Sequence, residues 1–301
     1  MGSALESLPA GSRVAVIRLR SLGDCVLTTP ALHLLKQARP DLRIAVAVED
    51  RFREIFAGNP GLDSVLAPSI AAVRAFRPAL CLNLHGGTRS AWMTAFSGAR
   101  IRAGFGHYRF PFVYNLQIPR AQQILGQERT VHTAEHLASA MFYLGVPVSE
   151  IPRALLFAPR GGIANSAVIH PVATAPEKAW TVEGFLAVAR HLQAAGLEPV
   201  FIGGAGDDLT PFSPWRTLAG APLSEVKSLL AGASLFVGND SGPAHMAAAF
   251  GVPVVVLFGT SDPVIWAPWR TTAAVLTAPG GIRSIEVRGV IDAIERLGVH
   301  A

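Results

Sequence analysis

Short β-branched runs alternate along this chain with segments in which apolar residues recur at helical spacing. This alternation limits the folds open to the chain more than any other feature of the sequence. A strand is predicted at 13–19, followed by a polar turn and a helix over 26–38. We expect further strands at 44–48, 65–66 and 80–84, and helices near 51–57, 69–76 and 88–97. Such repetition is typical of a parallel sheet with helices on both faces, because parallel neighbours need a crossover connection.

The same alternation restarts in the second half of the chain. Strands are expected at 166–170, 198–203, 234–237 and 253–258, and helices at 182–195, 223–231, 243–250 and 284–297. The stretch between the halves with the weakest pattern is 158–165, which contains Pro159, Gly161 and Gly162. We therefore predict two doubly wound α/β domains, residues 1–160 and 161–301.

One stretch, 106–130, has no clear period and carries Tyr108, Arg109 and Phe110. Loops of this length are uncommon in compact domains unless they are functional or mobile. Two interpretations stand side by side: a poorly packed insertion or extra hairpin, and a loop that faces the substrate.

Composition excludes several classes of protein. With 50% hydrophobic and 16% charged residues, the chain is neither disordered nor a coiled coil. Cys25 and Cys81 are too few for a disulfide framework or a zinc site. Residues 1–13 lack the pattern of a signal peptide, and the longest apolar run, 244–258, is interrupted by Gly251 and Pro253. We expect a cytoplasmic protein, with peripheral contact at the inner face of the membrane left open.

Charge is unevenly distributed between the halves. Residues 1–160 hold 18 basic and 10 acidic residues, a net charge of +8, whereas 161–301 hold 8 and 11, a net of −3. Arginine suits planar phosphate and carboxylate groups, so the first half is interpreted either as facing an acidic partner or as an arginine-rich soluble surface. No nucleic-acid recognition motif accompanies the charge, and no nucleic-acid partner is expected.

The turn after the first strand holds the first chemical candidate, Asp24. Ligands of open α/β sheets bind where strands end and helices begin. A carboxylate there either caps the helix or serves as a general base, and Gly23 allows close approach of the backbone. His85, after a later strand of the same half, either contacts substrate at this edge or has a structural role.

In the second half, the stretch 238–245 follows a buried-type strand and opens a helix with Pro243 in its first turn. Free amides at Ser241 and Gly242 are suited to a diphosphate, and Asp240 to hydroxyl groups or to orienting the turn. The alternative is an ordinary strand-to-helix turn. No Gly-Lys-Ser/Thr follows, so this is not a P-loop.

Two further loops of the second half carry candidates. Lys178 is a compact cation suited to a departing phosphate, or else a solvated lysine beside a packing Trp180. His170 is interpreted as a hydrogen-bonded turn residue. The glycine-rich stretch 203–208 places Asp207 or Asp208 near a ribose. No Asp-x-Asp pair, Gly-x-Ser-x-Gly elbow or His-Glu-x-x-His motif is present, and no metal or cofactor is expected.

Three motifs in order resemble glycosyltransferase family 9, the heptosyltransferases of lipopolysaccharide core assembly. They are 18–24 (RLRSLGD), 178–180 (KAW) and 238–245 (GNDSGPAH), with a matching tail over 257–268. The resemblance covers most of the chain. It implies the GT-B architecture, two Rossmann-like domains that face each other across a cleft. The first would bind the acceptor and the second the nucleotide sugar, typically ADP-heptose.

The resemblance also implies roles for particular residues. Asp24 matches the family's proposed general base of an inverting, metal-independent transfer to an acidic acceptor. Donor binding falls on Lys178, Asp240, Ser241, Gly242, His245, Thr174 and, by spacing only, Ala221. For the acceptor, we expect Arg20 of the first motif, with His85 and Arg109 from the residue analysis above. Between Thr174 and Lys178 the chain has fewer acidic and basic residues than is usual for the family. The chain is also short for the family. A GT-B-like sugar-nucleotide epimerase or hydrolase, and a non-catalytic nucleotide-sugar-binding protein, are the alternatives.

Overall fold

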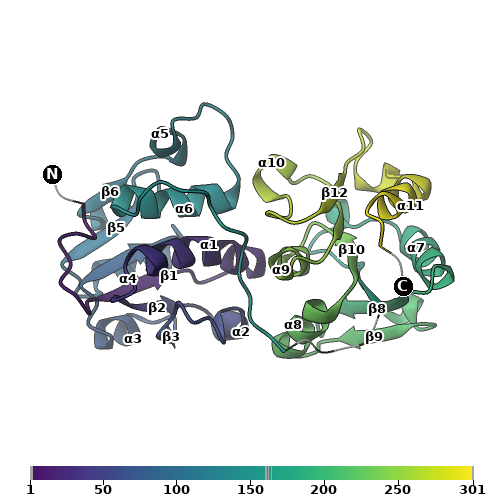
Figure 1. The fold of residues 1–301 in the computed structure, drawn as a ribbon, viewed down its shortest axis with the longest axis horizontal. Helices are drawn as coiled ribbons and strands as arrows, with labels where there is room; N and C mark the ends of the chain where they lie inside the picture. The colour runs from purple at the N-terminus through teal and green to yellow at the C-terminus, as the bar shows by residue number, and fades with distance from the viewer. Residues whose placement is uncertain (1–2, 160, 162, 164, 300–301) are drawn as a thin grey trace. The chain divides into compact units, whose positions relative to one another are not determined.

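A computed structural model describes residues 3–159, 161, 163 and 165–299 (Figure 1). The chain divides into two compact units, Met1–Phe157 and Ala158–Ala301. Gly162, part of the expected join, lies outside the described residues.

The first unit is built on a six-stranded parallel sheet in the order β3-β2-β1-β4-β5-β6. Its strands are β1 (Arg13–Ile17), β2 (Arg43–Ala47), β3 (Ser64–Leu66), β4 (Leu80–Asn83), β5 (Ile101–Phe105) and β6 (Leu116–Ile118). Its helices are α1 (Leu22–Ala38), α2 (Arg53–Phe56), α3 (Ile70–Ala75), α4 (Thr88–Ala95), α5 (Ala121–Leu125) and α6 (Thr133–Leu144), with short 3₁₀ turns η1 (Asp50–Phe52) and η2 (Pro111–Val113).

The second unit repeats this plan with the sheet order β12-β11-β10-β7-β8-β9. Its strands are β7 (Ser166–His170), β8 (Glu198–Gly203), β9 (Arg216–Ala219), β10 (Leu235–Asn239), β11 (Val254–Leu257) and β12 (Ala273–Leu276). Its helices are α7 (Val182–Ala194), α8 (Leu223–Gly232), α9 (Gly242–Phe250), α10 (Pro263–Trp266) and α11 (Val287–Arg296), with 3₁₀ turns η3 (Pro176–Lys178), η4 (Thr210–Phe212) and η5 (Ile282–Ser284).

Burial explains why the central strands read as continuous apolar runs. Every residue of β10 is buried, and only Arg13 of β1 is not, because helices cover both faces of each sheet. In the first unit α1 packs against α6, while Val73 of α3 and Met93 of α4 join Ile17 in a core on the sheet. In the second unit α7 and α11 pack on the strands through Phe185, Val290 and Ile294.

The predicted α/β class with doubly wound parallel sheets is confirmed, and the strands that were missed lie at the sheet edges or next to one. The segment 106–130 holds β6, which pairs parallel with β5 (Ala103 opposite Leu116), so the extra-hairpin interpretation is wrong. We did not predict β5, β9 or β12 either. These strands have short or glycine-containing sequences, and pairing with a neighbour rather than local pattern defines them.

Gly104 lies in β5, between β4 and β6, and provides a test of packing in one of the strands that the sequence pattern missed. A Cβ there would lie 2.6 Å from the ring of Tyr114, which is buried and accepts a hydrogen bond from Asn83. We expect Gly104→Ala to lower the free energy of unfolding by about 1–3 kcal/mol because the ring has no room to move. Gly289→Ala in α11, where a Cβ meets nothing within 4 Å, should instead stabilise by up to about 1 kcal/mol. Denaturant unfolding measures both, and equal effects would contradict the packing argument.

His136 of α6 makes stability depend on pH. Its ring stacks on Phe105 with centroids 4.1 Å apart; burial, and then the charges of His107 and Arg18, lower its pKa from 6.5 to about 4. Below pH 6.5 the unfolded chain takes up a proton that the native state refuses, so this stabilisation is lost as pH falls toward 4. The loss amounts to roughly 3 kcal/mol. His136→Gln should therefore show a flatter fall of unfolding free energy between pH 7 and 4; a profile parallel to that of the wild type would refute this assignment.

Candidate functional site

A pocket of about 410 Å³ lies at the carboxyl edge of the first sheet. Its lining comes from the β1–α1 turn, from η1 after β2, and from the loop after β4: Arg20, Ser21, Asp24, Arg51, Phe52 and His85. Because β2, β1 and β4 are neighbours and parallel, their following loops meet at one edge. Asp24, Arg20 and His85, predicted for the site, are thus brought together.

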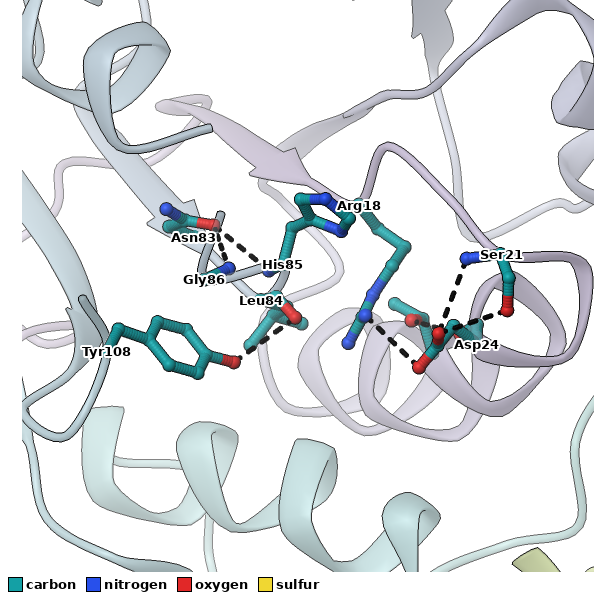
Figure 2. Close-up of polar contacts among 9 residues, drawn as sticks. Arg18, Ser21, Asp24, Asn83, Leu84, His85, Gly86 and Tyr108 are labelled. Carbon is teal, nitrogen blue, oxygen red and sulfur yellow. Dashed lines mark hydrogen bonds and ion pairs between the residues drawn. The ribbon is translucent and has the colours of Figure 1, made fainter. Parts of the chain in front are cut away.

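Asp24 is held by two different partners (Figure 2). One oxygen, Oδ1, accepts a hydrogen bond from Nη1 of Arg18 at 3.2 Å. The other, Oδ2, accepts bonds from the backbone N–H and the hydroxyl of Ser21, at 3.3 and 3.1 Å. Ser21 is the N-cap of α1, so Asp24 completes a capping box. The capping interpretation is therefore correct, and the same carboxylate also lines the pocket.

Arg18 has no role in the sequence interpretation beyond membership of the motif. It is the residue after β1, and its buried side chain reaches Asp24. Its Nε has no hydrogen-bond partner among the described residues. A buried guanidinium fixed against one carboxylate oxygen restricts the rotation of that carboxylate.

His85 is positioned by the residue two places before it. The buried Asn83 accepts hydrogen bonds from the backbone N–H of His85 at 2.9 Å and of Gly86 at 3.1 Å (Figure 2). Gly86 has a φ of +77°, and a Cβ there would lie 2.8 Å from the ring of Tyr108. Burial, and then the positive charge of Arg18, lower the pKa of His85, with Asp24 opposing. The imidazole is therefore suited to act as a neutral hydrogen-bonding group.

Arg109 lies outside this pocket lining. Its exposed guanidinium stands 5.3 Å from the ring centre of Phe110. Conversely, sequence reasoning missed Arg51 and Phe52. The available signal was their place just after a strand of the same sheet, since the carboxyl ends of β1 and β2 share an edge.

In the second unit, Asn239 ties two loops together at the equivalent edge. It is the last residue of β10 and is fully buried. Its Oδ1 accepts a hydrogen bond from the backbone N–H of Trp180, and its Nδ2 donates to the carbonyl of Pro171 at 2.9 Å. The loop after β7, which carries Lys178, is thereby fastened beside the start of α9.

Ser241 is the N-cap of α9, and Gly242 is the first residue of the helix. The Ser241 hydroxyl does not cap the helix, and within the described part of the chain its buried Oγ has no hydrogen-bond partner. Amides at a helix start carry partial positive charge and suit an anion.

Asp240, in the loop after β10, interacts with groups from two other loops, those after β7 and β11. Burial raises its pKa, while a hydrogen bond with Ser261 and the charge of Lys178 act in the opposite direction. A Cβ on Gly259 would collide with the carbonyl of Glu177 and lie 3.2 Å from Cα of Lys178, so glycine lets the loop after β11 pass closely. Ser261 had no role assigned from sequence, although it lies in the motif tail.

The remaining candidates lie around this edge. Thr174 is exposed in the loop after β7, Ala221 is half-buried after β9, and His245 is buried in α9. Nδ1 of His170 finds no hydrogen-bond partner among the residues described, so the predicted hydrogen bonding of this histidine is not met there; burial lowers its pKa to about 4. The carboxylates of Asp207 and Asp208 accept bonds from their own loop, at Gly204 and Thr210.

No helix in the described ranges is both long and apolar enough to cross a membrane. Nor do three His, Cys, Asp or Glu side chains in those ranges group as a metal site requires.

Comparison with known proteins places these features in a family. The model of glycosyltransferase family 9 (heptosyltransferase) matches residues 71–283. Lipopolysaccharide heptosyltransferase 3 of Escherichia coli is 28% identical, with 91% of each chain covered.

Solved structures share the fold. The family 9 glycosyl transferase of Veillonella parvula superposes with a TM-score of 0.83 at 23% identity, covering 95% of this chain and 97% of that one. The E. coli heptosyltransferase WaaC with ADP-2-deoxy-2-fluoro heptose gives a TM-score of 0.76 at 21% identity, covering 95% and 99%. The two doubly wound sheets are those of GT-B enzymes. The chain therefore belongs to glycosyltransferase family 9, the heptosyltransferases, and is a glycosyltransferase.

Proposed function

We propose that this enzyme transfers a heptose from ADP-heptose to an acidic acceptor of the lipopolysaccharide core. Its relatives are named as lipopolysaccharide heptosyltransferases, and one structural neighbour holds an ADP-heptose analogue. The observation that carries the proposal is the pocket in which Asp24 stands among Arg20, Arg51 and His85. A carboxylate beside cationic groups suits an acceptor that must be deprotonated and that carries negative charge.

The first unit would bind the acceptor, through Arg20, His85 and Arg109, with Asp24 as general base. Asp24 takes the proton of an acceptor hydroxyl while that oxygen forms a bond to the anomeric carbon. The bond from this carbon to the diphosphate breaks on the opposite face, so configuration inverts and ADP leaves with the electron pair. Arg18 holds Oδ1 in place throughout, which fixes the direction in which the carboxylate presents itself.

The second unit would bind the donor. Amides of Ser241 and Gly242 at the start of α9 face the diphosphate, and Lys178 neutralises the charge that builds up on the leaving group. Asp240, braced by Ser261, receives hydroxyl groups of the donor. Thr174 and His245 complete the surroundings, and Ala221, three strands away at the end of β9, borders the adenine. These groups supply the electrostatic stabilisation without a metal.

A glycolipid acceptor fixes where the enzyme works. We place it in the cytoplasm, in peripheral contact with the inner face of the membrane that carries the acceptor.

Asp24→Asn tests the base. The amide still accepts a hydrogen bond from Ser21, so the fold and ADP binding should be kept, while turnover falls about 100-fold or more because no group removes the proton. Transfer kinetics and ADP titration measure the two effects. Full activity would remove Asp24 from the chemistry, and donor breakdown by the wild type without any acceptor would favour a hydrolase or epimerase instead.

Lys178→Ala tests the donor site, with Glu177→Ala as the control on the same short turn. We expect ADP binding, turnover or both to fall about 10–100-fold in the lysine variant, the value of a lost charge-assisted contact, and little change in the control. Calorimetric titration with ADP and steady-state kinetics report the outcome. If both variants behave alike, Lys178 is only a surface lysine.

A further inference from the structure

Four aromatic side chains form a patch on the first unit, which we call the aromatic patch: Trp92, Phe96, Phe110 and Phe112. Trp92, Phe96 and Phe112 are 40%, 52% and 71% exposed. The ring of Trp92 lies 6.0 Å from Phe96 and 6.2 Å from Phe110, and Phe110 lies 6.0 Å from Phe112. Single exposed apolar residues are ordinary, but four contiguous rings mark a surface that binds something.

The patch is held in place from beneath. Ala91 of α4, Val113 of η2 and the buried Tyr114 form a small core against which Phe110 packs. The exposed rings therefore project from a packed base, which reduces the entropy lost when a partner covers them.

The segment of chain that carries the patch has charges of one sign. Between residues 64 and 127 the sequence contains no Asp or Glu, and its charged residues are Arg74, Arg77, Arg89, Arg100, Arg102, Arg109 and Arg120. One of these arginines contacts the patch and a second contacts the core beneath it. Arg109 lies 5.3 Å from the ring centre of Phe110, and Nε of Arg102 donates to the carbonyl of Val113. The partner that this surface fits is therefore apolar and anionic at once.

We propose that the aromatic patch docks on an anionic lipid bilayer. Trp and Phe enter the interface between head groups and acyl chains, and arginine is attracted to anionic lipid. A second copy of this chain fits worse, because it would bring the same positive surface against the first. The proposal deepens the proposed function, since it names the surface that meets the membrane.

The position of the patch relates it to the acceptor pocket within the same unit. Helix α4 begins at Thr88, directly after the 85–87 turn that carries His85. At a rise of about 1.5 Å per residue, Trp92 lies roughly 6 Å along the helix from that end, and Phe96, the C-cap, follows the opposite end. The segment 106–112 is fastened next to this turn, because the Tyr108 hydroxyl donates a hydrogen bond to the carbonyl of Leu84, the residue before it (Figure 2). A lipid-linked acceptor would therefore present its sugar close to the membrane-facing surface.

Vesicle binding tests the proposal, without donor or acceptor. The probes are vesicles of phosphatidylethanolamine and phosphatidylglycerol, and vesicles of phosphatidylcholine alone. The variant is Phe96→Ser with Phe112→Ser; the matched control is Val148→Ser with Val264→Ser, at positions 75% and 53% exposed outside the patch. We expect the wild type and the control to bind the anionic vesicles. The affinity of the patch variant for them should be lower by a factor of about ten or more. Added salt should weaken binding.

Three results would overturn it: equal binding by the patch variant and the control, equal binding to both kinds of vesicle, or a dimer of the wild type that the patch variant dissolves. Thermal unfolding confirms that the variants are folded. Transfer to a water-soluble, delipidated acceptor separates this proposal from the proposed function. The patch variant should keep that activity, whereas a wild type that binds vesicles but transfers no heptose would refute the proposed function alone.

Discussion

Parallel pairing of the central strands is the constraint on which both candidate sites depend. Parallel strands begin at one edge of a sheet and end at the other, so the loops that follow them share an edge whatever their separation in sequence. In the first unit this brings Asp24, Arg51 and His85 to one pocket, from the loops after β1, β2 and β4. In the second it brings Lys178, Asp240 and Ser261 together from the loops after β7, β10 and β11.

In both units a buried asparagine at the end of a central strand forms hydrogen bonds with the backbone of the adjoining loops. Read from the opposite edge, the second sheet has the order of the first, so β4 and β10 hold equivalent places. Each ends in a fully buried asparagine, Asn83 and Asn239. An amide offers both a donor and an acceptor, and each satisfies the backbone of nearby loops that no strand pairs. The chemistry at these edges is thus carried by loops that the sheet cores hold rigid.

Arg18 shows how one side chain joins the fold to the site. It follows a buried strand, and its guanidinium forms an ion pair with Asp24. The same positive charge lowers the pKa of His85. Asp24 in turn completes the capping box of α1. The same carboxylate therefore stabilises the helix that positions it, which explains how capping and the proposed catalysis coexist at one residue.

Local sequence patterns were enough to predict the α/β class, all interior strands but β5, and the turns at Asp24 and at 238–245, because buried strands and helix starts leave such patterns. The family could also be recognised from the sequence, because the motifs and their order along the chain are visible without a structure. The tertiary fold alone placed four strands, β6, β9 and β12 at sheet edges and β5 next to one. It also placed Arg51 and Ser261 and brought Trp92 together with Phe110 and Phe112. These depend on which strands and loops become neighbours across long stretches of chain, and strand order, unlike a turn or a helix cap, is not written in any short run of residues.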